Sequence, residues 1–167
     1  IETAARRGAL GVAARAVEQR LNADRSDHHG LPVACACGTE ARYGGRHVKT
    51  FQSALGELRL ERACCHCGTC GSGFCPRDRA LGLEDSSLSP AVTRMVGRVG
   101  AMVSSAEGSE LMRELAGVTV DAKQVERTAE RLGREIAQDE RIVLEPEPPP
   151  APTMYLGMDG TGVPMRG

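Results

Sequence analysis

Aromatic side chains are scarce in this sequence. They make up 2% of its 167 residues, with no Trp, two Tyr and two Phe. Aromatic rings bury much area per residue, so their scarcity excludes a large aromatic core and leaves Leu, Val, Ala and Met to build one. We therefore expect small modules with an additional source of stability, and not one deep core.

The sequence also lacks a net excess of charge of either sign. Its formal net charge is −1 at pH 7, so the whole chain has no basic signature. The charge is nevertheless unevenly spread: basic residues outnumber acidic ones between Cys35 and Ala80, whereas Asp121 to Glu147 is acidic on balance. The local basic surplus permits contact with phosphate without requiring it.

Long apolar runs are absent as well. No run approaches the roughly 18 apolar residues that a membrane span needs, and the N-terminal stretch contains Arg6, Arg7 and Arg15 without the apolar block of a secretory signal. We therefore expect a soluble cytoplasmic protein without a membrane partner. Seven Cys in a reducing compartment favour a metal site over a disulfide framework.

Two types of secondary structure alternate along the chain. Residues 2–21 predict a packing or dimerisation helix, because apolar residues recur at helical spacing: Leu10, Ala14, Val17 and Leu21. Two strand-like runs, 47–55 and 57–63, flank Gly56, and Leu58 and Leu60 alternate with charged residues. This pattern predicts a β-hairpin with one half-buried face.

Three short helices are expected between residues 89 and 137. Each begins with a capping signal: Ser89-Pro90, Ser104 with Glu107, and Asp121 with Gln124. The first two carry apolar residues that we assign to a buried face: Val92, Met95, Val96, Val99, Met102, Val103, Leu111, Met112 and Leu115. A Gly-containing turn at 116–119 precedes the third helix, as in helix-turn-helix units. In the third helix, apolar residues again recur at helical spacing: Val125, Ala129, Leu132 and Ile136.

The third helix is the candidate for contact with DNA. In helix-turn-helix proteins, the N-terminal residues of the recognition helix reach base edges in the major groove. Here these residues are Lys123, Gln124 and Arg127, with Arg131 placed for phosphate. The same helix also carries many acidic residues, so a helical bundle that serves only packing or dimerisation is the alternative.

Four cysteines have the spacing of a structural zinc site. Cys35 and Cys37 form one close pair and Cys67 and Cys70 another, with the predicted hairpin between them. Zinc takes four tetrahedral ligands and thiolates suit it. A glycine follows Cys37 and Cys70, which lets backbone N–H groups turn toward the sulfur atoms. Other ligand sets remain open, because further candidates lie nearby: Cys64, Cys65, His66 and Cys75. A cluster of free thiols is the alternative to a metal site.

The C-terminal part reads as a linker and the start of another domain. Residues 145–152, EPEPPPAP, predict an extended linker. The apolar run 153–158 predicts a strand ending at Asp159-Gly160. A carboxylate at a strand end can bind Mg²⁺, although an Asp that starts a turn is the alternative.

Taken together, these features resemble one family. The segments that carry the resemblance are, in order, CACGTEARY, VKTFQSALGELRLERA, CHCGTCGSGFCPRD, LGLEDSSLSP, ELAGVTVDAKQVERTAERLGRE, the Pro-rich linker and MDGTGVPM. They look like the Kra-type bacterial insertion-sequence transposases of the DDE superfamily. The match runs from about Pro32 to Met165 and so covers most of the chain.

The resemblance implies an α+β protein of several modules. These are an N-terminal helix and linker (1–30), a zinc-ribbon-like module (31–80), a helix-turn-helix region (86–140), a Pro-rich linker (141–152) and the start of a ribonuclease-H-like catalytic domain (153–167). The resemblance makes Cys35, Cys37, Cys67 and Cys70 the ligands of a structural zinc ion. It makes Asp159 the first of three catalytic carboxylates, which hold Mg²⁺ in the intact catalytic domain.

The expected function is therefore that of the DNA-binding N-terminal part of a transposase. The partner would be double-stranded DNA at the transposon ends, in the nucleoid, and homo-oligomerisation is compatible with this role. Because the chain starts at Ile1, stops at Gly167 and holds one of three carboxylates, we expect a catalytically inactive piece of a longer reading frame. The alternatives are a stand-alone zinc-ribbon and helix-turn-helix regulator, and a zinc-dependent interaction module that binds no DNA.

Overall fold

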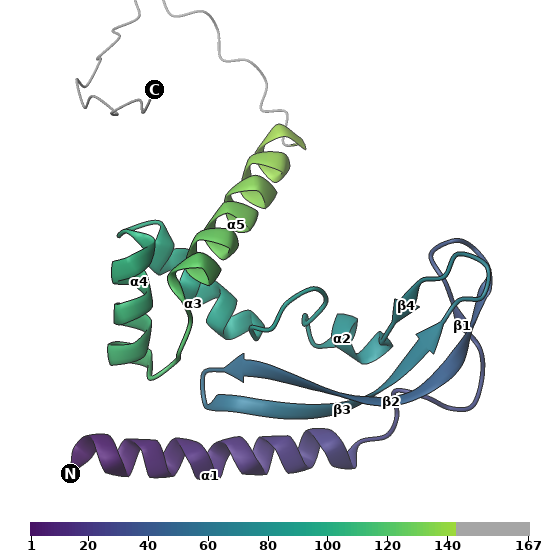
Figure 1. Cartoon of the computed structure of the whole chain (residues 1–167), viewed down its shortest axis with the longest axis horizontal. Helices are drawn as coiled ribbons and strands as arrows, with labels where there is room; N and C mark the ends of the chain where they lie inside the picture. Colours follow the sequence, from purple (N-terminus) through teal and green to yellow (C-terminus); the bar gives the residue numbers. More distant parts are fainter. Residues whose placement is uncertain (143–167) are drawn as a thin grey trace, which may run out of the picture.

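The computed structural model describes residues 1–142 of the chain. The predicted strand 153–158, Asp159 and the linker beyond residue 142 lie outside the described residues. The described part is an α+β fold with an N-terminal helix, a curled four-stranded antiparallel sheet and a group of helices (Figure 1). Its elements are α1 (Glu2–Ala23), β1 (Val33–Ala34), β2 (Glu40–Ser53), β3 (Gly56–His66), β4 (Gly73–Phe74), α2 (Pro76–Ala80), α3 (Pro90–Gly100), α4 (Ser105–Leu111), η1 (Met112–Ala116) and α5 (Ala122–Ile142).

The long hairpin of β2 and β3 is the centre of the fold. A two-residue turn joins the strands, Ser53 pairs with Gly56, and Gly56 has a φ of 119°, which favours glycine. Both strands extend beyond the predicted runs. The short strands β1 and β4 pair with β2 and β3 at the open end of the hairpin, in the order β1-β2-β3-β4. The turn end of the hairpin lies beneath α3 and α4 in Figure 1, and its open end points away from these two helices.

The hairpin buries different faces at its two ends. Near the turn, Leu58 and Leu60 are buried with Phe51 and Leu83. Toward the open end, the buried residues of β3 are Ala63 and Cys65. Because side chains alternate between faces every residue, these two sets point to opposite sides of the strand. The predicted half-buried face therefore holds only near the turn. A β-bulge between Tyr43 and Gly45 of β2 lies further toward the open end, opposite Cys64 and Cys65.

Helix α1 covers the outer edge of β3. The Glu18 carboxylate accepts a hydrogen bond from the Arg59 backbone N–H at 2.8 Å. The Asn22 side chain accepts from the Glu61 N–H at 2.8 Å and donates to the Arg59 carbonyl at 2.9 Å. After the helix, Asp27 accepts from the Ala63 N–H at 2.7 Å. Side chains of α1 and its following loop thus take the place of a neighbouring strand. Figure 1 shows α1 running alongside the hairpin.

Helix α2 joins α1 to the hairpin through two buried charged residues. The Arg77 guanidinium donates to the carbonyls of Leu21 and Asp24 at the end of α1, at 2.6 and 2.7 Å. The Asp78 carboxylate pairs with Arg62 of β3 at 2.6 Å and with Lys49 of β2 at 3.4 Å. Since Arg77 and Asp78 are neighbours, one short helix holds both α1 and the hairpin.

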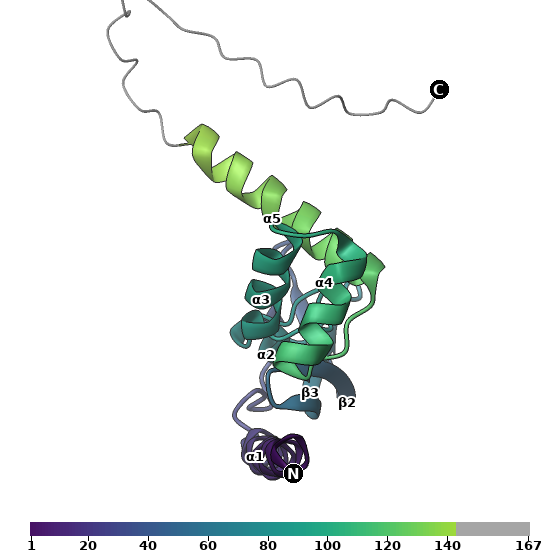
Figure 2. The ribbon, with the colours of Figure 1, turned by 90° about the vertical axis from the view of Figure 1, so that its left-hand side faces the viewer.

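The helices α3, α4, η1 and α5 form a second compact unit. The unit lies on the opposite side of the hairpin from α1 (Figure 2). Its core consists of Leu88, Val92, Val96, Met112, Val118, Val120 and Val125. Close packing of α3 and α5 requires glycine at position 100, because a Cβ there would lie 2.9 Å from the Ala129 Cβ. Two backbone hydrogen bonds connect the unit to the hairpin: the Gln52 N–H of β2 donates to the Ser87 carbonyl, and the Ser89 N–H donates to the Gln52 carbonyl.

The capping signals are confirmed. Ser89 caps α3, Ser104 and Glu107 form a capping box at α4, and Asp121 accepts from the Gln124 N–H at 2.8 Å. The expected apolar faces are wrong at five positions, which are exposed by between 37% and 82%: Val17, Met95, Met102, Leu115 and Ile136. The short helices bury a narrower stripe than the sequence pattern suggests. Among the helices of residues 1–142, none has the length and apolar character needed to cross a membrane.

We predict that Asn22→Ala destabilises the chain by about 1–2 kcal/mol, because it removes two hydrogen bonds to the edge of β3. Urea unfolding monitored by circular dichroism measures the effect. Gln19→Ala, at an exposed position of the same helix, is the matched control and should change stability by a few tenths of a kcal/mol. Equal stability of the two variants would contradict the role of Asn22.

Candidate metal centre and nucleic-acid interface

Two tight turns at the open end of the hairpin present the four predicted cysteines. In the first turn, the Cys35 N–H donates to the Thr39 carbonyl at 2.8 Å and the Gly38 N–H donates to the Cys35 carbonyl at 3.0 Å. In the second, the Cys67 N–H donates to the Ser72 carbonyl and the Gly71 N–H to the Cys67 carbonyl, both at 2.9 Å. Gly38 and Gly71 have φ values of 83° and 72°, so each turn needs glycine after its second cysteine.

The four sulfur atoms have the geometry of a tetrahedral site. The Sγ atoms of Cys35, Cys37, Cys67 and Cys70 all lie within 4.8 Å of one another. Two of the distances, Cys35 to Cys70 and Cys37 to Cys67, are 3.6 Å. A zinc ion with bonds of about 2.3 Å to four thiolates sets its sulfur atoms roughly 3.8 Å apart. The donor set therefore fits zinc, and in the described part of the chain it is the one cluster of three or more such ligands.

The thiols of the cluster affect one another's ionisation. Hydrogen bonding, first from the Thr39 hydroxyl and then from backbone N–H groups, lowers the pKa of Cys67 to about 5. The Ser72 backbone opposes the shift at Cys70, but the neighbouring sulfurs of Cys67, Cys35 and Cys37 raise its pKa to about 12. One thiolate therefore opposes the next. Full ionisation of all four sulfurs requires a cation among them, which is what a bound metal provides.

The predicted DNA-contacting residues lie together. Lys123, Gln124, Arg127 and Arg131 all line one depression between the N-terminal half of α5 and the loop 85–88. The Gln124 amide donates to the Ser87 hydroxyl at 3.0 Å. Lys123, Arg127 and Arg131 are all exposed. Arg131 forms an ion pair with Glu135 at 2.9 Å. The helix thus presents several cations on the side that faces away from the core.

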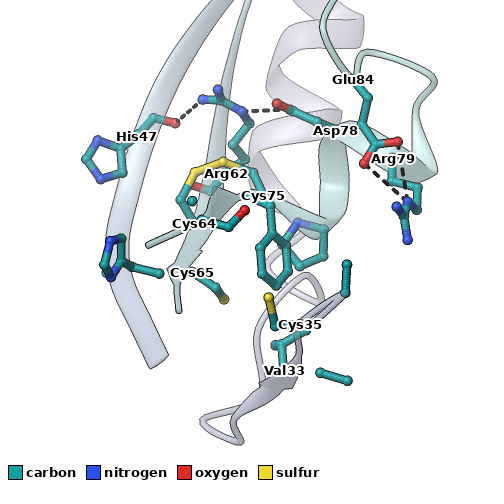
Figure 3. A pocket seen from close by; sticks show the side chains of 18 of the residues that line it. Val33, Cys35, His47, Arg62, Cys64, Cys65, Cys75, Asp78, Arg79 and Glu84 are labelled. Carbon is teal, nitrogen blue, oxygen red and sulfur yellow. Dashed lines mark hydrogen bonds and ion pairs between the residues drawn. A yellow bond between two sulfur atoms is a disulfide. The ribbon is translucent and has the colours of Figure 1, made fainter. Parts of the chain in front are cut away.

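The remaining cysteines are not part of the four-sulfur cluster. Cys64 of β3 forms a disulfide with Cys75, the residue before α2. Figure 3 shows this bond in the wall of a cleft, with the Arg62–Asp78 ion pair on one side and Cys35 and Cys65 on the other. Cys65 is a free, buried thiol, and burial raises its pKa. The preference for a metal site over a disulfide framework is therefore met in part: four of the seven cysteines gather in a cluster that could hold a metal, whereas one pair forms a disulfide.

Sequence reasoning missed three features of these sites. Arg134 lines the same depression as the predicted DNA contacts. It follows Arg131 by three residues, as Arg131 follows Arg127 by four, and this spacing is a helical signal. The Cys64–Cys75 pair carries no local signal, because β4 and the second cysteine turn separate its members. Thr39 contacts two of the sulfurs, and its position two residues after Cys37 is compatible with many roles.

The comparisons with known proteins give no relative. No family model matches the chain, and no curated protein is significantly similar to it. The geometry and chemistry of the two sites therefore carry the functional inference.

We predict five reactive thiols in the unfolded, metal-free, unreduced chain and seven after reduction, because Cys64 and Cys75 are paired. A chromogenic thiol reagent in denaturant measures both numbers. The double variant Cys64→Ser/Cys75→Ser should lose about 2–3 kcal/mol of stability in oxidising buffer, since the bond closes a short loop. In reducing buffer this difference from the native chain should shrink strongly. Seven reactive thiols before reduction would contradict the disulfide.

Proposed function

We propose that this chain is a zinc-stabilised DNA-binding protein, and more narrowly the DNA-binding N-terminal part of an insertion-sequence transposase. The observation that carries the proposal is the gathering of Lys123, Gln124, Arg127 and Arg131 along one depression of α5. The residues picked out by their position on a predicted recognition helix are thus close together in space.

The zinc part of the proposal is supported by the four sulfurs at the open end of the hairpin. Their separations match a tetrahedral thiolate site, and the two glycine-containing turns fix the backbone around them. This end of the molecule has a small core of Cys35, Ala41, Cys65 and Cys67. A bound metal would add stability that so few apolar atoms do not supply.

The DNA part is supported by the arrangement of α4, η1 and α5. A turn with Gly117 in the left-handed conformation, at a φ of 70°, precedes α5. Val125 and Thr128 of α5 are buried against the unit, which leaves Lys123 and Arg127 on the outer side. This is the disposition that a recognition helix needs, with an apolar side inward and cationic groups toward phosphate.

The transposase part rests on the ordered resemblance of the sequence segments to Kra-type transposases. In that proposal, residues 1–142 bind DNA and take no part in strand cleavage. An interaction module without DNA is the main competitor, because acidic residues also lie on the exposed side of α5: Glu126, Glu130 and Glu135. Binding to DNA distinguishes the two.

We predict about one zinc ion per chain, as expected for a four-cysteine site, by elemental analysis of protein purified under reducing conditions. Cys35→Ser and Cys67→Ser should each lose the zinc together with the order of the hairpin's open end. Cys65→Ala is the control, because its sulfur lies outside the cluster, and it should keep the zinc. A folded, reduced, native chain without metal would reject the zinc site.

We predict salt-dependent binding of the zinc-loaded chain to duplex DNA. In Arg131→Gln, the slope of log affinity against log salt should fall by about 1, since one lost phosphate contact removes roughly 0.9. Arg113→Gln removes an exposed cation of η1 that does not line the depression, and should leave the slope unchanged. Fluorescence anisotropy over a range of salt gives the slopes. Absence of binding at low salt would favour the interaction module.

A further inference from the structure

We propose that Thr39 is a positioning residue of the metal centre, whose hydroxyl donates a hydrogen bond to the Cys67 thiolate and thereby strengthens metal binding. The inference rests on the proposed zinc site and extends it beyond the four ligands. It starts from a contact between the two cysteine turns that involves a side chain other than cysteine.

The Thr39 hydroxyl lies between sulfurs of both turns. Its Oγ1 is 3.1 Å from the Cys37 Sγ and 3.2 Å from the Cys67 Sγ. Its backbone carbonyl accepts from the Cys35 N–H, so the residue that closes the first turn also reaches a ligand in the second. The backbone of Thr39 is therefore fixed, and this places its short side chain with the hydroxyl against both sulfurs.

The hydroxyl has one proton, and burial decides which sulfur gains most from it. Cys67 is 0% exposed, so solvent cannot hydrate its thiolate. Cys37 is exposed and can accept hydrogen bonds from water. A thiolate in a dry site depends on donors from the protein, and the Thr39 hydroxyl adds to the backbone N–H groups that already serve Cys67. Donation to Cys67 therefore stabilises the site more than donation to Cys37. The Cys37 sulfur also lies within hydrogen-bond distance of the Thr39 oxygen.

The effect on the metal follows from the charge of the ligand set. Four thiolates around Zn²⁺ carry a net charge of about −2, and each hydrogen bond to sulfur offsets part of that charge. The bond also fixes the direction of the sulfur lone pairs, as groups behind a ligand generally do. Removing the donor should weaken zinc binding without removing a ligand.

Three variants test this inference. Thr39→Val keeps the shape and removes the hydroxyl, whereas Thr39→Ser keeps the hydroxyl. Thr69→Val is the matched control: it makes the same change in the other turn, where Thr69 is exposed and its hydroxyl makes no hydrogen bond to the described residues. Zinc affinity is measured by competition with a chromophoric chelator under reducing conditions. Thr39→Val should bind zinc about 10–100-fold more weakly, while Thr39→Ser and Thr69→Val should stay within about threefold of the native chain.

Cobalt substitution separates a direct effect on sulfur from a general loss of structure. Co²⁺ bound by thiolates has a sulfur-to-metal charge-transfer band, and loss of a hydrogen bond to sulfur should move it to lower energy in Thr39→Val alone. Equal affinity and an unshifted band in Thr39→Val would overturn the inference while the zinc site stands. A native chain that binds neither metal would instead overturn the proposed function on which the inference rests.

Discussion

A two-stranded hairpin is marginally stable in water unless its edges and faces are covered. The β2–β3 hairpin meets this constraint along both edges. On the β3 side, Glu18 and Asn22 of α1 supply the hydrogen bonds that another strand would give. On the β2 side, the segment 87–89 pairs with Gln52 and leads directly into α3. The placement of the helices at both sides of the hairpin follows from this need.

Charged side chains contribute to the interior where apolar side chains are few. Arg77 and Asp78 are 7% and 8% exposed, yet each has several oppositely charged or carbonyl partners. Removing one partner of such a network would leave an unpaired buried charge. The four-cysteine cluster is subject to the same constraint, because four crowded thiols need a cation before all can ionise. Electrostatic complementarity thus supplements the aliphatic cores in a chain with few aromatic residues.

Local signals were readable in the sequence and long-range ones were not. Ser89, Ser104 and Asp121 cap helices through bonds to backbone groups within three residues, so their pattern is visible along the chain. The cysteine spacing predicted proximity equally well, since the four cysteines that it picked out lie together. The docking of α1 through Asn22 escaped notice, because a polar residue after an apolar stripe is usually read as solvent-exposed. The change of buried face along β3 was not predicted either, since it depends on partners from distant segments of the chain.

That change of face has a bearing on how the chain avoids misfolding. A hairpin whose strands slip by one residue exchanges its inward and outward side chains. Here such a slip would expose Leu58 and Leu60 at one end and Ala63 and Cys65 at the other. It would also carry Cys67 away from Thr39 and Cys37. Both cores thus require the same pairing register, and a hairpin in the wrong register would lose stability at both ends.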